Sequence, residues 1–300
     1  MSEQSVGAKW RWYLAAFAAT FIMATLGVFV REVSPGNELV VALGRFGIGF
    51  VCLAGLAALK RGDPTPPARV TGALVASGVC LALFVVFYFK AVLSGPLANA
   101  AFLLYLGPLV ASTLAALWLG EGFNRMSGVL LGGALLGTLF ITEFRIPDSA
   151  DQVESLVFGV LSGVFYGLFL LLNNPKLQGA GSSYARTRYQ FLFATLALVP
   201  VVALDGVSLR LADLPWIIAV GVLHGFVALT LVVASLGYLR TIEYGTISYG
   251  EPVMAALLGV VLYSESISLL QVVGCLFVLV AGIARVFLRE QAPVPTRTGL

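Results

Sequence analysis

The chain has 300 residues, of which 59% are hydrophobic and only 11% are charged, and its formal net charge is +3. Ordinary soluble domains carry about 25% charged residues, so this composition excludes a water-soluble globular protein and indicates a chain that lies within lipid. The small net charge, without a dense Lys/Arg run, argues against a nucleic-acid partner. Cys52, Cys80 and Cys275 lie far apart in apolar runs, which argues against a disulfide framework or a cysteine metal site.

Charge-poor runs of about 20 mainly apolar residues are long enough to cross a bilayer, and the sequence contains ten candidates. The N-terminal half supplies residues 12–30, 39–59, 70–89, 97–119 and 126–142. The C-terminal half supplies residues 156–172, 184–204, 215–236, 244–263 and 268–287. The sequence therefore predicts an all-α integral membrane protein with ten transmembrane helices.

An internal repeat relates the two halves. An offset of 144 residues places Tyr105 on Tyr249, Pro108 on Pro252, Glu121 on Glu265 and Asn124 on Ser268. Self-similarity at a fixed offset is the sequence signature of a duplicated unit. We predict an N-terminal five-helix repeat over residues 1–142, a linker over residues 143–155 and a C-terminal five-helix repeat over residues 156–300, which together form a single transmembrane unit.

The distribution of basic residues predicts the orientation, because loops rich in Lys and Arg stay in the cytoplasm. With the N-terminus inside, 13 basic residues lie on the cytoplasmic side and 4 lie outside. The four outside are Arg31, Lys90, Arg145 and Arg210. An odd number of spans in each half inverts the second half relative to the first, which predicts an inverted five-plus-five repeat with both chain ends in the cytoplasm.

Polar residues within apolar helices usually face the bundle interior or an aqueous cavity, so their helical phase is informative. On the ninth run, Tyr244, Ser248 and Glu251 share one face. On the third run, Ser77, Phe84 and Tyr88 share a face, and on the sixth run Ser162, Tyr166 and Asn173 do so. The pattern predicts a polar central path lined by aromatic rings.

Glu251 is the most costly of these residues to place in a membrane, at perhaps ~2.5 to 3.5 kcal/mol. It contacts a substrate ammonium or exchanges a proton, or else it forms a structural pair with Arg240 or a backbone group beside Pro252. His224, the single histidine, binds a carboxylate, relays a proton or makes an ordinary interhelical bond. Arg45 meets a substrate carboxylate or has a structural role, and we favour the structural role.

Asn99 and Phe102 lie three residues apart on the fourth run, where they offer a ligand a hydrogen bond and a ring, although ordinary packing explains them too. Glu121 and Glu265 precede the last run of each half, where the positive end of a helix favours a carboxylate. We expect both to be structural anchors and expect Asn124 and Ser268 to cap the same helices.

Small residues let helices approach closely in lipid, where no hydrophobic force drives association. Gly159, Gly163 and Gly167 form such a stripe on the sixth run. A second stripe lies on the fifth run and comprises Gly128, Gly132, Gly133 and Gly137. We expect both stripes to mark helix contacts.

This arrangement resembles the drug/metabolite transporter superfamily, on the segments from Pro108 to Glu121 and from Pro252 to Glu265, each followed by a glycine-rich run. More narrowly it is similar to the ten-helix EamA-type branch that contains bacterial inner-membrane exporters of aromatic amino acids. Ser264 departs from the pattern, because it stands where the family has glycine. The resemblance implies alternating access around a substrate held at the membrane midplane.

The resemblance implies a multi-pass inner-membrane transporter, not an enzyme, that exports hydrophobic and aromatic amino acids and related metabolites by facilitated diffusion. Aromatic side chains hold the substrate's ring, and polar groups such as Asn99, His224 and Glu251 hold its zwitterion. The expected substrate-binding residues are Tyr88, Asn99, Phe102, Tyr166, His224, Tyr244, Ser248 and Glu251.

We expect no catalytic residue, metal or other cofactor, and a monomer whose partners are the bilayer and an amino acid or amphipathic metabolite. The alternative is a proton-coupled drug/metabolite antiporter with Glu251 as the exchanging carboxylate. An intramembrane enzyme is disfavoured, because no pair of histidines is spaced to bind a metal. A passive scaffold or receptor is disfavoured because the longest loop has about a dozen residues.

Overall fold

The computed structural model describes residues 4–59, 70–119, 125–141, 149–173, 177, 183–204, 210–236, 247 and 250–290. Within these ranges every regular element is helical and none is a strand, so the predicted all-α class is confirmed. The first half contains α1 (Gln4–Ala24), α2 (Leu26–Arg31), α3 (Glu38–Leu59), α4 (Gly72–Ser94), α5 (Leu97–Leu104), α6 (Gly107–Leu119) and α7 (Arg125–Ile141). The second half contains α8 (Ala150–Leu172), α9 (Ser183–Leu204), η1 (Leu211–Asp213), α10 (Leu214–Ala219), the π-helix η2 (Val220–Val227), α11 (Ala228–Leu236), α13 (Gly250–Tyr263) and α14 (Leu269–Glu290).

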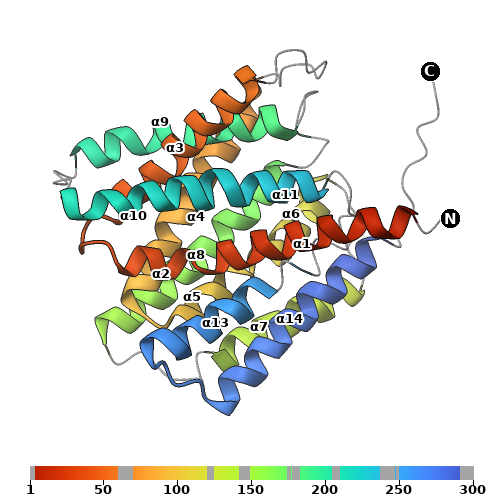
Figure 1. Cartoon of the computed structure of the whole chain (residues 1–300). Helices are drawn as coiled ribbons and strands as arrows, with labels where there is room; N and C mark the ends of the chain where they lie inside the picture. The colour runs from red at the N-terminus through yellow and green to blue at the C-terminus, as the bar shows by residue number, and fades with distance from the viewer. Residues whose placement is uncertain are drawn as a thin grey trace.

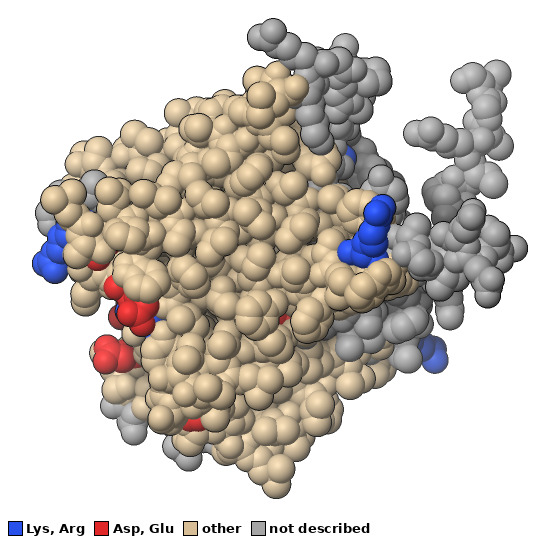
Figure 2. Space-filling model, viewed as in Figure 1, with Lys and Arg blue, Asp and Glu red and all other residues tan. Residues whose placement is uncertain are grey.

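Among the residues that the structure describes, six helical stretches are long and apolar enough to cross a membrane. They are Trp10–Arg31, Glu38–Leu59, Gly72–Ser94, Ala150–Leu172, Tyr184–Leu204 and Leu211–Val232. Gly250–Tyr263 and Leu269–Ala281 are shorter apolar helices. Figure 2 shows one face on which charged side chains gather at two opposite edges, while the broad area between them is almost entirely uncharged. This pattern fits an integral membrane protein, and the full number of ten spans stays a prediction.

The helical spans are interrupted in three places within the described residues. The first span bends at Thr25 between α1 and α2, and the fourth is broken at Tyr105 and Leu106 between α5 and α6. Pro108 explains the second break, since a proline has no N–H to donate to the carbonyl four residues back and is poorly tolerated inside a helix. The eighth span contains the π-helix η2, whose wider turn accommodates an extra residue.

Helices from the two halves pack against one another throughout the bundle. The α4 helix runs along α8, α3 packs against η2, α1 packs against α11, and α5 packs against α13. The α7 and α14 helices form a further pair, seen side by side in the lower right of Figure 1. The beginning of α1 and the end of α14 both lie toward the right-hand edge of that view. Each half therefore buries the other's apolar surface.

The glycine stripe on α8 makes the close contacts that its spacing predicts. A methyl group added at Gly163 would lie 2.5 Å from the Leu103 carbonyl oxygen, and one at Gly167 would lie 2.8 Å from the Gly107 carbonyl oxygen. These glycines bring α8 against the break between α5 and α6. On α7 only part of the stripe behaves as expected. Gly137 packs on the Gly274 backbone, whereas a methyl group added at Gly132 would meet no atom of another described element within 4 Å.

The buried carboxylate of Asp213 joins η1 to the loop before α3 at one end of the bundle. Asp213 Oδ1 accepts hydrogen bonds from Ser34 N at 3.0 Å and from Ser34 Oγ at 2.9 Å, and Asp213 Oδ2 accepts one from Asn37 Nδ2. Gly36, with φ of +87°, lets the intervening chain turn tightly enough to supply these donors. The loop before α3 is thereby tied to η1.

Replacing Gly163 with alanine should destabilise the protein by about 1 to 3 kcal/mol, because the added methyl would overpack a contact with backbone atoms that cannot rotate away. Gly55→Ala is the matched control, since Gly55 lies in helix α3 with no atom within 4 Å of the added methyl. Thermal unfolding in detergent measures both. Equal melting temperatures for the two variants would contradict the close approach of α8 to α5.

Candidate functional site

The bend at Thr25 and the π-helix η2 bring two polar side chains together. The Thr25 hydroxyl donates to the Ile22 carbonyl at 2.7 Å, and its oxygen lies 3.1 Å from His224 Nε2. The His224 ring is fully buried and meets the Phe29 ring edge-on, with centroids 5.2 Å apart. His224 Nδ1 has no hydrogen-bond partner among the described residues. The predicted interhelical bond exists, and it leaves one ring nitrogen available.

The break between α5 and α6 places a hydroxyl against the membrane carboxylate. Tyr105 caps the C-terminal end of α5, and its hydroxyl donates to Glu251 Oε2 at 2.9 Å. Glu251 is half-buried in the first turn of α13. Arg240, the structural partner considered from the sequence, lies outside the described residues. The structure therefore supplies a different partner for Glu251, a neutral one.

Arg45 adds a buried cation to this region. Its side chain is buried on α3, and Nη2 donates to the Met23 thioether sulfur at 3.6 Å, whereas Nε has no partner among the described residues. Arg45 interacts electrostatically with Glu251, Tyr88 and His224. The region therefore contains a cation, a carboxylate and an imidazole, drawn from α3, α13 and η2.

The predicted site residues fall into distinct groups. Tyr88 is buried and interacts electrostatically with Glu251 and Arg45, so it belongs to the same region as His224 and Glu251. Phe102 is buried in a separate apolar cluster with Tyr105, Ile141, Ala256 and Val278. Asn99 is half-buried on α5. Tyr244 and Ser248 lie outside the described residues.

Tyr166 belongs to the interface between α4 and α8. Its ring lies 5.2 Å from that of Phe84 and stacks on that of Phe169 at 6.5 Å. The predicted polar faces of these two helices do meet, through a residue that sequence analysis missed. Gln190 Nε2 on α9 donates to Ser77 Oγ at 2.9 Å and to Asn173 Oδ1 at 2.8 Å.

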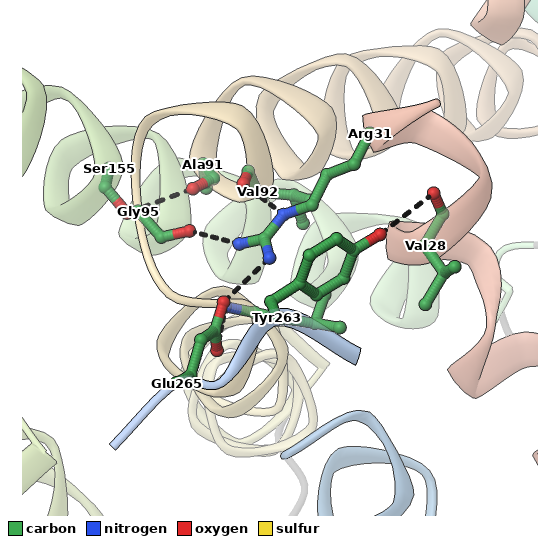
Figure 3. A network of polar contacts seen from close by, with 9 residues as sticks. Val28, Arg31, Ala91, Val92, Gly95, Ser155, Tyr263 and Glu265 are labelled. Carbon is green, nitrogen blue, oxygen red and sulfur yellow. Dashed lines mark hydrogen bonds and ion pairs between the residues drawn. The ribbon is translucent and has the colours of Figure 1, made fainter. Parts of the chain in front are cut away.

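A charged network closes one end of the bundle, at the end of α2 (Figure 3). Arg31 Nη1 donates to Glu265 Oε1 at 2.7 Å, Nη2 donates to the Gly95 carbonyl at 2.7 Å, and Nε donates to the Val92 carbonyl at 3.2 Å. The Tyr263 ring lies 4.4 Å from the Arg31 guanidinium carbon, within cation–π range. We call these residues the Arg31 cluster.

Glu265 is an anchor, but for a different helix than predicted. Its carboxylate accepts from Leu97 N at 3.0 Å, so it neutralises the first turn of α5 and not that of α14. The capping prediction for Ser268 is confirmed, since Ser268 Oγ accepts from Gln271 N at 3.2 Å. Glu121 and Asn124 lie outside the described residues.

The backbone around the Arg31 cluster is shaped to fit it. Ser264 has φ of +54°, a left-handed conformation that residues other than glycine rarely adopt. This conformation suits the glycine that the resemblance implies at this position, and the turn brings Glu265 back toward α5. Gly95 lies so close to Ser155 that a side chain would collide with its hydroxyl, which itself donates to the Ala91 carbonyl at 3.0 Å.

The metal-ligating residue types do not cluster in the part of the chain that the structure describes. There, no group of three or more His, Cys, Asp or Glu side chains is placed to hold a metal ion. The site's chemistry is that of hydrogen bonding and charge pairing.

Comparison with known proteins identifies the class. The sequence pattern of the EamA-like transporter family matches residues 10–143 and again residues 154–287. An uncharacterized transporter of Archaeoglobus fulgidus is 27% identical over 266 residues, covering 88% of this chain and 92% of that protein. A pseudopaline exporter, CntI, of Pseudomonas aeruginosa is 30% identical over 218 residues, covering 70% of this chain and 72% of the exporter.

A solved crystal structure of another protein has the same fold. It superposes with a TM-score of 0.62 at 20% sequence identity, covering 94% of this chain and 98% of the other.

The Arg31–Glu265 ion pair should show a strong energetic coupling, because both side chains are only about 15% exposed. Removing either one leaves the other buried without its charge partner. We expect Arg31→Met and Glu265→Leu each to destabilise the protein, and the double variant to be more stable than their sum predicts by about 1 to 3 kcal/mol. Unfolding of all three variants in detergent measures this coupling. If the losses of stability in the two single variants simply add up in the double variant, the ion pair contributes nothing to stability.

Proposed function

This chain belongs to the EamA-like transporter family, and we propose from that premise that it exports hydrophobic and aromatic amino acids and related amphipathic metabolites. It is a multi-pass membrane protein, and its relatives are transporters, not enzymes. Transport proceeds by alternating access and facilitated diffusion, through a monomer in the cell inner membrane. Both chain ends face the cytoplasm, as the distribution of basic residues indicates.

The observation that carries the proposal is the pairing of Glu251 with Tyr105. The carboxylate receives a hydrogen bond from a neutral hydroxyl, and no basic side chain of the described residues forms an ion pair with it. An intramembrane carboxylate is costly without a positive partner; Arg45 acts on Glu251 electrostatically without forming an ion pair with it, and a substrate ammonium group supplies a direct partner. The buried ring of Tyr88 and the partly buried ring of Phe29 offer apolar surface to an aromatic substrate.

The export direction is supported by a relative. The protein from Pseudomonas aeruginosa that is 30% identical to this chain is named an exporter. The preference for aromatic substrates rests on the resemblance to aromatic amino acid exporters and on the rings around Glu251.

The pairing of α5 with α13 supports alternating access. The two helices pack together. At one end Glu265, just after α13, accepts from the first residue of α5, and at the other end Tyr105, just after α5, donates to Glu251 at the start of α13. The two helices therefore run antiparallel and are joined at both ends. A substrate that binds Glu251 replaces the hydrogen bond from Tyr105. This loosens α5 and weakens the contact between its first turn and Glu265 in the Arg31 cluster.

Proton-coupled antiport is the second candidate, and the same carboxylate favours it. Glu251 has no basic partner within 4 Å among the described residues, so it can bind either an ammonium group or a proton. Dependence of transport on an imposed pH gradient would favour antiport. Equal rates with and without the gradient would favour facilitated diffusion.

In proteoliposomes we expect efflux of labelled phenylalanine to exceed that of aspartate by at least about tenfold, because a hydrophobic ring suits the site and a second carboxylate does not. Glu251→Gln should reduce phenylalanine efflux by about tenfold or more, and Tyr105→Phe by about threefold to tenfold, the range for a lost hydrogen bond.

Glu154→Gln provides the control, since Glu154 is exposed on α8 and should retain wild-type efflux. Comparable rates for aspartate and phenylalanine would refute the substrate assignment. Wild-type efflux from Glu251→Gln would refute the site.

Locking the Arg31 cluster should stop transport. In a variant with Cys52, Cys80 and Cys275 replaced by alanine, Arg31→Cys and Glu265→Cys can be joined by a reducible bifunctional thiol reagent. We expect efflux to fall to background and to recover on reduction, because alternating access requires this end to open.

The single Arg31→Cys variant treated with the same reagent controls for modification alone. Undiminished efflux through the cross-linked protein would show that this end does not open during transport.

A further inference from the structure

Arg45 is an unusual residue for a lipid-embedded helix, because it is buried and forms no direct ion pair with a carboxylate of the described residues, although Glu251 acts on it electrostatically. It is 7% exposed, its Nη2 donates to a thioether sulfur, and its guanidinium carbon lies 6.0 Å from the Phe46 ring centre. A guanidinium has five N–H donors, and a sulfur and a ring are weak partners for it. A buried cation without a carboxylate or phosphate partner is strongly disfavoured. The Arg45 guanidinium therefore has donor N–H groups that can bind an additional acceptor.

The backbone holds Arg45 in this position. A methyl group added at Gly225 would collide with the Arg45 carbonyl oxygen, and one at Gly221 would lie 2.9 Å from the Gly44 carbonyl oxygen. Helix α3 is thus pressed against the π-helix η2, with Arg45 beside the residue that follows His224. These contacts fix the backbone of Arg45 beside η2.

His224 offers the opposite kind of group. The Thr25 hydroxyl donates to the Ile22 carbonyl, and we therefore assign His224 Nε2, 3.1 Å from the Thr25 oxygen, as the donor to that oxygen. In the neutral ring the other nitrogen is then an acceptor, and Nδ1 is the atom that has no partner. Glu251 is a second acceptor in the same region, in electrostatic contact with Arg45.

One buried donor cation and two acceptors match the two ends of an amino acid. We propose that Arg45 binds the substrate's carboxylate while Glu251 and His224 Nδ1 accept hydrogens from its ammonium group. Arg45 is then a specificity-determining residue, and the site selects molecules with both a free carboxylate and an amine over the corresponding amines, amides and esters. This inference rests on the proposed function and adds to it a requirement for the carboxylate.

Competition measurements on the wild-type protein test the inference without any variant. Efflux or counterflow of labelled phenylalanine in proteoliposomes is measured against unlabelled phenylalanine, phenylalanine amide and phenethylamine. We expect phenylalanine to compete at least about tenfold better than either analogue, the factor for a lost charge-assisted hydrogen-bond pair. Equal competition by all three would overturn the role of Arg45 and leave the proposed export function standing.

Arg45→Met and Arg45→Lys separate recognition from structural support. If Arg45 binds the carboxylate, Arg45→Met should lower the ratio of phenylalanine to phenethylamine transport by about tenfold or more, and Arg45→Lys should retain part of the preference. Arg210→Met is the matched control, because Arg210 is exposed at the start of η1 and its loss should leave the ratio unchanged. A structural role would lower both transport rates together at a constant ratio.

If the Arg45 variants do not fold, the competition measurements on the wild-type protein decide the matter alone. If neither phenylalanine nor phenethylamine is transported by the wild-type protein, the proposed function itself fails, and the inference fails with it.

Discussion

A break in a transmembrane helix leaves backbone groups without partners in a medium that offers no water, and this constraint organises the structure. The described part of the chain has three such irregularities, at Thr25, at Tyr105 and in the π-helix that carries His224. Side chains at these positions contact one another or a charged group, since Thr25 meets His224 and Tyr105 meets Glu251. The irregularities and the polar centre of the protein are therefore one feature. Each break places a polar side chain in the interior of the bundle, and the contact that this side chain makes there stabilises the break.

The short helix α5 connects this centre with the closed end. Its 8 residues span about 12 Å at 1.5 Å per residue, and a glutamate from the second half is bonded at each of its ends. In the mechanism that we propose, a change at Glu251 reaches the Arg31 cluster through a rigid element of little more than two turns. This is a direct physical link of the kind that coupling between two sites requires.

Composition and apolar periodicity were enough to predict helices in a membrane, because lipid imposes a length and a polarity on every span. They could not predict the breaks, since a proline at position 108 or a threonine at position 25 is tolerated in many continuous helices. The sequence singled out Glu251 and His224 because ionisable groups are costly to bury in lipid. It did not single out Tyr105 and Thr25, because a hydroxyl group at a helix end costs little free energy there. The partner of Glu265 was mispredicted for another reason: its carboxylate serves a helix that lies 168 residues away in sequence, and phase within one helix carries no information about such a contact.

The division of these contacts between the halves bears on how the protein is made. Arg31, Arg45 and Tyr105 leave the ribosome long before Glu251 and Glu265 exist to meet them. The first half must enter the bilayer as a set of spans whose polar groups have only temporary neighbours, such as lipid headgroups, water or the insertion machinery. These contacts form only when α13 packs beside α5, which brings Glu251 and Glu265 to their partners together. The earlier spans therefore reach their folded arrangement only after the late spans have been synthesised.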